Sequence, residues 1–281
     1  MRLMVLGCGN VGSEVARRAR ARGWEVVATT TTPARVPELE AVADELVVLS
    51  GNDAAAVKAA AEGADAILVA ASPRLMSSVT VEDRANSYRD VLVASCESAA
   101  AACDRVVFMS SISVYGDGTH ESRDILDEDT PRTDSDEPSS VFFGLAEDAA
   151  LAAPRGAVLR LADVHGGDND MDYTTRVRFV HEQWGGSTAF SRSGRLHRVH
   201  VDDVADAVMH VLAEDLTGIY NCVPDVEPAP TNGEAFDAIA DAAGMPRLEF
   251  REELRTPTQQ VSSRRLRDSG FVFSHPADPL V

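Results

Sequence analysis

The first dozen residues constrain the fold of this chain more than any other segment. Residues 3–6 form an apolar run, Leu-Met-Val-Leu, that leads directly into Gly-Cys-Gly-Asn-Val-Gly at residues 7–12. Gly7 would allow a sharp turn, Gly9 would let backbone N–H groups approach a pyrophosphate, and Gly12 would let a helix pack closely on the strand. The pattern therefore predicts a strand and a turn that bind a dinucleotide.

A helix is predicted immediately after this turn. Val11, Val15 and Ala19 are spaced four apart and so lie on one helical face. Asn10 and Val11 would open the helix, and we expect both to contact the ligand together with the glycines. A tight turn without a ligand would use similar glycines, but the position between an apolar strand and a helix favours the dinucleotide site.

Strands and helices alternate through the first half of the chain. This alternation predicts an α/β fold in which helices cover both faces of a parallel sheet. The polar, acidic stretch 116–140 is predicted to be a long surface loop. The apolar runs predicted as strands are 25–29, 46–49, 66–71, 105–109 and 157–161, and the predicted helices are 53–62, 81–103 and 144–153.

The regular alternation ends after Gly166, which suggests a second, smaller unit. An amphipathic helix at 200–215 is expected to return to the sheet, with Asp202 or Asp203 as its N-cap. We therefore expect a Rossmann-type, doubly wound sheet and a small C-terminal α+β substrate lobe. The expected bounds are 1–165 with 200–215 for the sheet, and 166–199 with 216–281 for the lobe.

Composition narrows the range of partners. The formal net charge of −19 over 281 residues argues against nucleic acid or an anionic membrane as a partner. No apolar run is long enough to span a membrane, and the first strand begins at residue 3, so we expect a cytoplasmic protein. The cysteines and histidines show no metal-ligand spacing, so no metal site is predicted. Reduced, buried thiols are expected at Cys8, Cys96, Cys103 and Cys222.

A cluster of hydroxyl residues ends the strand predicted at 105–109. Residues 107–116 read Val-Phe-Met-Ser-Ser-Ile-Ser-Val-Tyr-Gly, which places the hydroxyls at the carboxyl edge of the sheet, where ligands bind. With the glycine turn, this stretch resembles the extended short-chain dehydrogenase/reductase superfamily, in its NAD-dependent epimerase/dehydratase branch. Residues 159–166, 199–205 and 218–223 are similar to three further segments of that family.

The resemblance implies a catalytic serine, tyrosine and lysine, but this chain matches only the serine. Ser111 matches the family's serine, although a strand-end hydroxyl that bonds the backbone is an equal alternative. The family's Tyr-x-x-x-Lys helix aligns with Phe143 and Glu147, which lack the proton and the ammonium group; a shift by one gives Phe142 and Ala146. Tyr115 is not the family's catalytic tyrosine, and we expect its ring to pack structurally.

No other residue is an obvious replacement. Lys58 is the only lysine, and it belongs to a helix of the cofactor-binding half. The candidate substitutes are Glu147, His165, Tyr173 and His120, and for each a structural or solvent-facing role is the favoured interpretation. The resemblance therefore points to the atypical members of the superfamily.

The end of the second strand predicts the cofactor. An acid there would select NAD, but this chain has Thr29, Thr30 and a nearby Arg35, which suit the 2′-phosphate of NADP. The alternative is NAD, with the threonines beginning a loop and Arg35 facing solvent. The resemblance places Asn52 and Asp53 near the adenine. It also predicts that Ala70, Ala71 and Ser72 line the cofactor groove.

Two functions remain open at this level. In the first, the protein transfers hydride to or from a sugar nucleotide or a small hydroxy or carbonyl compound, with Ser111, Ser113, Arg195 and Arg198 at the substrate. In the second, the protein is a non-catalytic, NAD(P)-dependent redox sensor or binding module. The resemblance also makes a homodimer possible, because dimers are common in the family.

Overall fold

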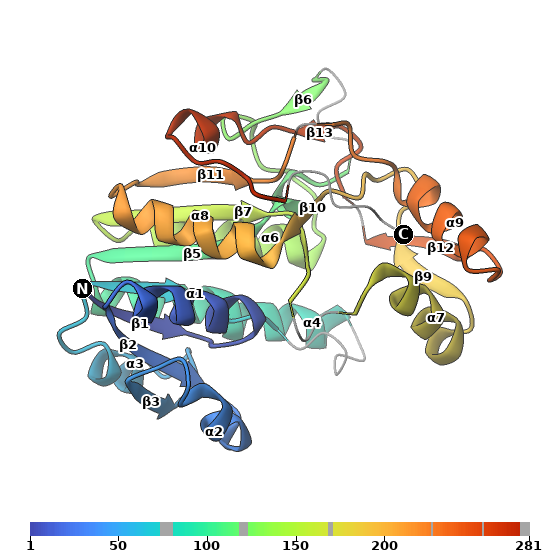
Figure 1. Ribbon diagram of the computed structural model, residues 1–281. Coiled ribbons are helices and arrows are strands. Elements are labelled where there is room, and N and C mark those ends of the chain that lie inside the picture. The colour runs from blue at the N-terminus through green and yellow to red at the C-terminus, as the bar shows by residue number, and fades with distance from the viewer. Residues whose placement is uncertain (74–80, 118–122, 168–170, 226, 255, 276–281) are drawn as a thin grey trace.

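A computed structural model describes residues 1–73, 81–117, 123–167, 171–225, 227–254 and 256–275. Its centre is a seven-stranded parallel sheet in the order β11-β7-β5-β4-β1-β2-β3 (Figure 1). The Rossmann-type, doubly wound architecture is thereby confirmed. The strands are β1 (Arg2–Leu6), β2 (Glu25–Thr30), β3 (Glu45–Val48), β4 (Ala66–Val69), β5 (Arg105–Ser111), β7 (Arg155–Leu161) and β11 (Gly218–Cys222).

Helices cover both faces of this sheet because successive strand side chains point to opposite sides. Leu3 and Val5 of β1 belong to one buried cluster, which includes α1 (Asn10–Ala21) and α8 (Val201–Ala213). Met4 and Leu6 belong to the other. Figure 1 shows α1 and α8 together in front of the sheet. The helices of the second cluster are α3 (Ala54–Ala60), α5 (Ala94–Ala102) and α6 (Pro138–Leu151).

The helix predicted at 81–103 is present with a local change in winding. It consists of α4 (Val81–Tyr88), a π-helical turn (Arg89–Val93) and α5. A π-turn inserted into a helix often marks a functional position. Here it directly follows Tyr88, which faces the second cleft described below.

Two features of the predicted 116–140 loop differ from expectation. Helix α6 begins at Pro138 instead of Gly144, because proline is favoured in the first turn and the Glu137 carboxylate accepts the N–H of Ser140 at 3.1 Å. The loop also contains a short strand, β6 (Ile125–Leu126), which pairs with β13 (Gln260–Val261). Short connecting elements are α2 (Val36–Leu39) and the 3-10 turns Pro33–Arg35 and Ile112–Tyr115.

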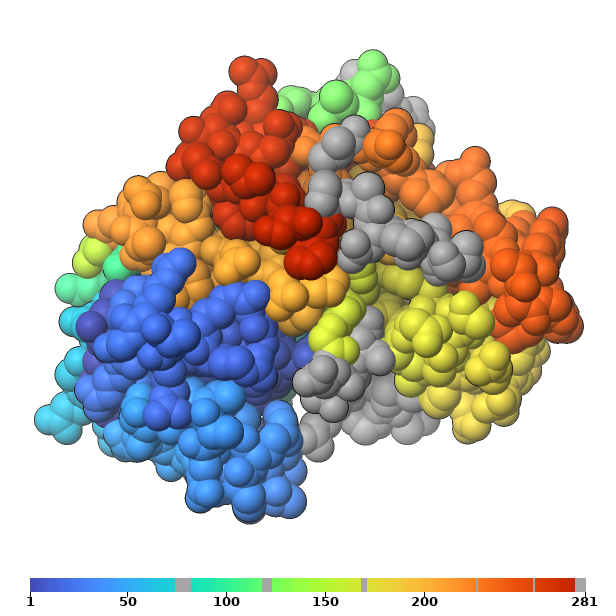
Figure 2. All heavy atoms as spheres, in the orientation of Figure 1, coloured from blue at the N-terminus to red at the C-terminus, as the bar shows by residue number. Residues whose placement is uncertain are grey.

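A small lobe lies beside the sheet and has its own core. It contains α7 (Tyr173–Trp184), β9 (Ser187–Phe190), α9 (Asn232–Ala242) and β12 (Glu249–Leu254). Strands β9 and β12 pair in parallel, and Val177, Phe236 and Ile239 are buried between the elements. Figure 2 shows these segments, in yellow and orange, on the side of the molecule away from the blue N-terminal half.

The segments after residue 216 are divided differently from the expected lobe. Strand β11 pairs with β7 in register Gly218↔Ala157, so it forms the edge of the central sheet. Helix α10 (Arg264–Asp268) contacts β11, and Phe271 and Phe273 are buried in the main core. Only the middle of the C-terminal region, around α9 and β12, therefore belongs to the lobe.

The N-cap of α8 is His200, and not Asp202 or Asp203 as expected. His200, at the end of β10 (Arg198–His200, paired with β8, Asp163–His165), caps the helix by accepting the N–H of Asp202 at 3.2 Å. Asp203 is fully buried instead, and its carboxylate accepts the N–H groups of Ser274 at 2.7 Å and His275 at 2.9 Å. The acidic side chain thus anchors the C-terminal segment. Among the described helices, none combines the length and apolarity needed to cross a bilayer.

Candidate functional site

The three glycines of the N-terminal turn have different surroundings. Gly7 adopts φ +97°, and a Cβ at Gly7 would lie 2.6 Å from the Ala71 backbone. A Cβ at Gly12 would lie 2.5 Å from the Gly7 carbonyl oxygen. A Cβ at Gly9 would meet nothing within 4 Å, and no side chain caps α1 at this residue. Gly7 and Gly12 therefore permit close packing, whereas Gly9 leaves the N-terminus of α1 open and without a side-chain cap.

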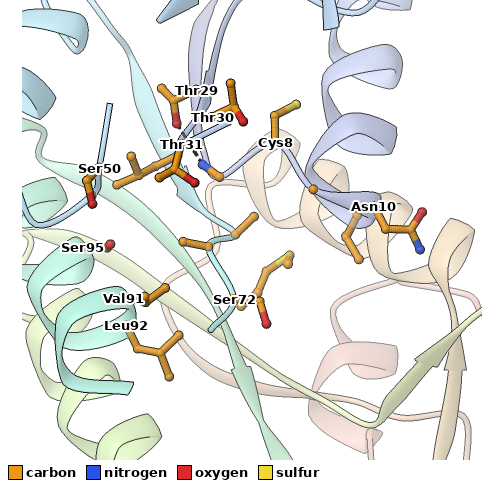
Figure 3. A pocket seen from close by; sticks show the side chains of 18 of the residues that line it. Cys8, Asn10, Thr29, Thr30, Thr31, Ser50, Ser72, Val91, Leu92 and Ser95 are labelled. Atoms are coloured by element: carbon orange, nitrogen blue, oxygen red, sulfur yellow. Dashed lines mark hydrogen bonds between the residues drawn. The ribbon is translucent and has the colours of Figure 1, made fainter. Parts of the chain in front are cut away.

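The glycine turn forms one wall of a cleft of about 780 Å³. The cleft lies at the carboxyl ends of the central strands, where open parallel sheets bind their ligands. Of the predicted cofactor residues, all but Gly12, Asn52 and Asp53 line it (Figure 3). Those lining it are Gly7, Gly9, Asn10, Val11, Thr29, Thr30, Arg35, Ala70, Ala71 and Ser72.

The threonines at the end of β2 bond mainly to the protein itself. The buried Thr29 hydroxyl donates to the Val5 carbonyl at 3.2 Å. It also accepts the Gly7 N–H at 3.0 Å, and Figure 3 marks this second bond. The Thr30 hydroxyl accepts the N–H of Thr32 at 3.1 Å. Thr29 thus holds the glycine turn against the sheet, and its side chain positions the cleft.

Arg35 lies at the edge of the same cleft. Its Nη1 donates to the Cys8 carbonyl at 2.8 Å, and its Nη2 contacts Glu38 at 2.8 Å. The hydrogen bond from Arg35 lowers the pKa of Glu38, so both groups are charged at neutral pH. Arg35 therefore brings a fixed cation to the end of β2, although Glu38 shares it.

The opposite wall differs from the prediction for Asn52 and Asp53. The Asp53 carboxylate accepts the Ala56 N–H at 3.0 Å as the N-cap of α3, and neither residue lines the cleft. Ser50 and Ser95 lie across the cleft from Cys8 and Asn10 (Figure 3). The Ser95 hydroxyl is buried and has no hydrogen-bond partner among the described residues.

The first cleft adjoins a second one at the end of β5. Ser111 and Phe143 line both clefts. The Ser111 hydroxyl accepts the N–H of Ser113 at 3.1 Å, which leaves its own proton for another acceptor. Phe143 comes from α6 and packs against Phe108 and Tyr88, with ring centroids 6.2 Å and 5.9 Å away.

Glu147, one turn after Phe143, lies in the core and lines neither cleft. Its carboxylate accepts Nε and Nη2 of Arg160 at 2.9 Å and 2.8 Å, and the Ser110 hydroxyl at 2.7 Å. Burial alone would lower the pKa of Arg160, but the Glu147 carboxylate raises it overall. The pair is therefore a charged, structural contact.

Tyr115 is also part of the core. Its hydroxyl lies 2.9 Å from both the Asp127 carbonyl oxygen and the Asn221 Oδ1. The Arg160 guanidinium stacks over the ring at 4.9 Å, and burial raises the pKa of Tyr115 to about 12. These contacts agree with the structural packing expected for this ring.

The second cleft measures about 760 Å³ and is bounded by the lobe. Large apolar and aromatic side chains from α7, β9 and α9 form much of its lining. Ser72, Ser111, Ser113 and Tyr88 contribute hydroxyls on the side of the first cleft. The larger apolar residues from the lobe are Tyr173, Val177, Phe179, Val180, Trp184, Phe190, Phe236, Leu248 and Leu254.

Comparisons with known proteins bear on the first cleft directly. Residues 7–135 match a family model described as NAD(P)H-binding. The UDP-glucose 4-epimerase of Thermus thermophilus, solved in complex with NAD, superposes with a TM-score of 0.72 at 22% identity, covering 98% of this chain and 94% of that one. The chain has an NAD(P)-binding, epimerase/dehydratase-like fold.

One further solved structure and one protein sequence match this chain over nearly their whole length. Human epimerase family protein SDR39U1, solved with NADPH, has a TM-score of 0.70 at 19% identity and covers 99% of this chain and 96% of its own. Protein YeeZ of Escherichia coli (strain K12) is 27% identical over 100% of this chain and 98% of its own length. The fold that the extended short-chain dehydrogenase/reductase resemblance implies is therefore confirmed by the solved structures.

Within this fold, the candidate catalytic substitutes are held by other groups. Tyr173 lines the second cleft, but its hydroxyl donates to the Asp163 carboxylate at 2.5 Å. The ring of His165 packs 5.4 Å from His200. His120 lies outside the described residues. None of these contacts places a substitute beside Ser111.

The two arginines predicted at the substrate differ in position. Arg195 lines the second cleft, but its Nε and Nη1 donate to the carbonyls of Thr258 at 2.8 Å and Ala229 at 2.6 Å. Arg198 stacks over the Tyr173 ring at 5.5 Å and is not part of the lining. Both therefore shape the lobe more than they offer a free cation to an anionic substrate.

One group of potential metal ligands is brought together only by the fold. Single ligand atoms of His200, Asp202 and His275 lie within 4.8 Å of one another. The His200 and His275 rings stack face to face at 4.1 Å, and Asp202 is paired with Arg18 at 2.9 Å. Because the rings stack and the carboxylate already has a cation, this cluster is better explained as packing than as a metal site.

Tyr88 was missed by sequence reasoning. It lines the second cleft with Ser111 and Phe143 and is 6% exposed, and burial raises its pKa to about 12. No family motif marks it, because it comes from α4 and not from α6. In the structure, the π-helical turn that follows Tyr88 draws attention to this position, but no pattern in the sequence indicated that turn.

His197, in the second cleft, gives the protein a predicted pH dependence. Burial lowers the pKa of His197 from 6.5 to about 4. Between these values the unfolded chain binds a proton that the folded protein does not, so stability falls as the pH drops. We expect His197 to account for a loss of about 2 kcal/mol of unfolding free energy between pH 7 and pH 5.

Urea titrations at these two pH values measure the loss. The control is His197→Gln, which keeps a donor for the Gln259 carbonyl, 3.1 Å from Nε2, but has no titrating ring. The variant should lose about 2 kcal/mol less than the parent protein between the two pH values. An identical pH dependence in both proteins would contradict the assignment.

Proposed function

We propose that the protein is an NADP(H)-dependent oxidoreductase that acts on a carbonyl or hydroxyl compound held in the second cleft. The observation that carries this proposal is the junction of the two clefts at Ser111 and Phe143. A cofactor in the first cleft would there meet a substrate in the second. When bound, the cofactor supplies a hydride donor or acceptor.

The residues of the first cleft fit a dinucleotide. The open space beside Gly9 and the uncapped start of α1 suit a pyrophosphate, because backbone N–H groups and the helix dipole both favour an anion. The buried Ser95 hydroxyl, which has no hydrogen-bond partner among the described residues, supplies a polar atom on the opposite wall. These features together support cofactor binding in this cleft.

NADP is the favoured form of the cofactor. Thr30, Thr31 and Thr32 at the end of β2 offer no carboxylate for the 2′-hydroxyl of NAD, and Arg35 supplies a cation at the edge of the cleft. The ion pair with Glu38 moderates this preference, because a 2′-phosphate would compete with that carboxylate for Arg35.

Two hydroxyls could act on the substrate oxygen. The Ser111 proton is available, because its oxygen accepts the Ser113 N–H. The Tyr88 phenol carries its proton at neutral pH, because burial raises its pKa to about 12. In a reduction, we propose that Ser111 orients the carbonyl oxygen and that Tyr88 donates the proton to it.

Calorimetric titration with NADPH, NADP⁺, NADH and NAD⁺ tests the cofactor assignment. NADPH or NADP⁺ should bind more tightly than the corresponding form of NAD. Gly9→Val should weaken NADPH binding by about 100-fold, equivalent to about 2.8 kcal/mol, because the side chain would occupy the phosphate position. Its melting temperature should stay close to that of the parent protein, since the new Cβ meets no atom within 4 Å.

Gly12→Val is the matched contrast. Its Cβ would collide with the Gly7 carbonyl oxygen, so this variant should lose stability as well as binding. A Gly9→Val protein that binds NADPH like the parent would remove the proposed phosphate site. Tighter binding of NAD⁺ than NADP⁺ would refute the role of Arg35.

The second candidate function is a non-catalytic, NADP(H)-dependent sensor. The specific observation in its favour is that Phe143 and the buried Glu147 occupy the positions where the family carries its tyrosine and lysine. NADPH binding without NADPH oxidation, measured across a panel of carbonyl compounds and sugar nucleotides, would favour the sensor.

A further inference from the structure

We propose that the second cleft binds an apolar, aromatic carbonyl compound and not a sugar nucleotide. This inference rests on the proposed oxidoreductase function and assigns the substrate class of the same site. It follows from the lining of the cleft, from the state of its cations and from the placement of its hydroxyls.

Three large apolar side chains that line the cleft are only partly buried. Trp184, Met171 and Phe190 are 46%, 41% and 38% exposed, and all three line the cleft. Exposed apolar surface is common on proteins, but a concave gathering of such residues is typical of a ligand site. An apolar ligand would cover this surface without giving up strong hydration of its own, whereas a sugar would have to lose water from its hydroxyls.

Aromatic contacts hold this wall in place. Phe179 and Trp184 meet edge to face with ring centroids 5.4 Å apart, and Phe190 stacks on Phe236 at 6.3 Å. Phe236 also contacts Tyr173 at 6.5 Å. Because the rings support one another, the wall is preformed and suits a flat, aromatic ligand.

The cleft offers little to a diphosphate. The arginines and the histidine among its described lining residues are Arg176, Arg195 and His197. Arg176 is paired with Asp163 at 2.8 Å and donates to the Met171 carbonyl at 2.7 Å. Arg195 is held by two backbone carbonyls, and His197, with a pKa of about 4, is neutral at pH 7.

The anionic group in the lining works against a nucleotide as well. Asp163 itself lines the cleft, and because its carboxylate is paired with Arg176, the pair offers no net positive charge to a diphosphate. Binding a sugar nucleotide would therefore require Arg176 or Arg195 to leave its present partners. A neutral ligand needs no such change.

Several hydroxyls lie on the side of the second cleft that adjoins the first, while the lobe contributes the hydroxyls of Tyr173, Thr188 and Thr256 among its larger apolar side chains. Ser111 ends β5, Ser113 follows it and Tyr88 ends α4, whereas Trp184 and Phe190 belong to the lobe. The buried Ser113 hydroxyl has no hydrogen-bond partner among the described residues. A ligand with one oxygen at the hydroxyls and an apolar body against the lobe matches this distribution.

The chemistry of the step is a carbonyl reduction. Hydride from NADPH forms the new C–H bond at the carbonyl carbon, and the C=O π bond breaks. Its oxygen takes a proton through Tyr88, so that ketone, NADPH and a proton yield alcohol and NADP⁺. The reverse direction oxidises the alcohol with NADP⁺.

The test uses an aryl ketone whose fluorescence reports its surroundings, 6-propionyl-2-dimethylaminonaphthalene. We expect it to bind the full-length, NADP⁺-loaded protein with a blue-shifted emission, and UDP-glucose in excess should not displace it. Trp184→Ala should weaken the binding of the ketone by about tenfold, because the apolar contact between the ligand and the indole ring would be lost.

Leu145→Ala is the matched control. Leu145 is as exposed as Trp184, at 46%, but lines neither cleft, so its variant should bind the ketone like the parent protein. Because Trp184 is half exposed, its truncation should leave the fold intact, which a melting curve verifies.

Two results would overturn the inference: displacement of the ketone by UDP-glucose, or equal affinity of the parent and Trp184→Ala proteins for the ketone. NADPH calorimetry on the same samples separates this failure from that of the proposed function. Ketone binding without NADPH binding would support the apolar site and refute the oxidoreductase. NADPH binding without ketone binding would retain the cofactor site and refute the substrate class.

Discussion

Replacing Glu147 with alanine should lower the free energy of unfolding by about 3–5 kcal/mol. Glu147 is completely buried and accepts two hydrogen bonds from Arg160, which is itself 2% exposed. Without the carboxylate, the guanidinium would remain in the core with no equivalent counter-ion. The Ser110 hydroxyl would lose its acceptor as well. Urea denaturation of the parent and the variant measures the difference.

A double variant separates the charge from the packing. In Glu147→Leu with Arg160→Met, both charged groups are replaced by apolar side chains of similar volume, and most of the lost stability should return. The single Glu147→Gln variant keeps the shape but not the charge, and it should fall between the two. A loss below about 1 kcal/mol in Glu147→Ala would show that the ion pair does not support this core.

Replacing Tyr88 with phenylalanine should lower kcat for NADPH-dependent ketone reduction by about 10²- to 10³-fold. The variant removes only the hydroxyl that we propose as the proton donor. The ring that packs on Phe143 at 5.9 Å remains, so NADPH binding and melting temperature should change little. Ser111→Ala should show a similar loss, because the carbonyl oxygen would no longer be oriented.

The measurement is the initial rate of NADPH oxidation against pH, with calorimetric NADPH binding as the independent readout. Tyr173→Phe is the matched control: its hydroxyl is also in the second cleft, but it donates to Asp163. We expect this control to retain most of the parent activity. Undiminished turnover in Tyr88→Phe would rule out Tyr88 as the proton donor.

The features that the sequence predicted correctly are those written in consecutive residues. The glycine turn, the alternating strands and the amphipathic helix at 200–215 each depend on spacing within one segment. Periodicity therefore located them, and the central sheet followed from the known behaviour of α/β units. The position of β11 did not follow, because a strand that pairs with β7 looks the same as one that belongs to a lobe.

The chemistry of individual hydroxyls and acids was harder to predict. The hydroxyl of Thr29 is chemically suited to bind a phosphate, but its hydrogen bonds go to the carbonyl of Val5 and the N–H of Gly7. Asp53 similarly caps α3 instead of facing the cofactor cleft. Such local backbone partners are near in space but not always in sequence, and only the folded chain reveals them.

The second cleft was the least predictable part of the site. Its apolar wall draws on Met171, Trp184, Phe190 and Phe236, which lie up to 65 residues apart and share no motif. Tyr88 joins them from a helix in the cofactor-binding half. A pocket of this kind is a property of the assembled surface, and no window of the sequence contains it.

The ion pair between Glu147 and Arg160 also restricts which substitutions the chain can accept at these two positions. A lysine at position 147, where the family carries one, would place its ammonium beside the Arg160 guanidinium in a space sealed from water. Any route to the family's usual pair would therefore have to change position 160 before or together with 147, and supply a tyrosine at 143. Each of the two buried charges is tolerated because the other neutralises it, so a substitution of either residue alone would leave an unpaired charge in the core.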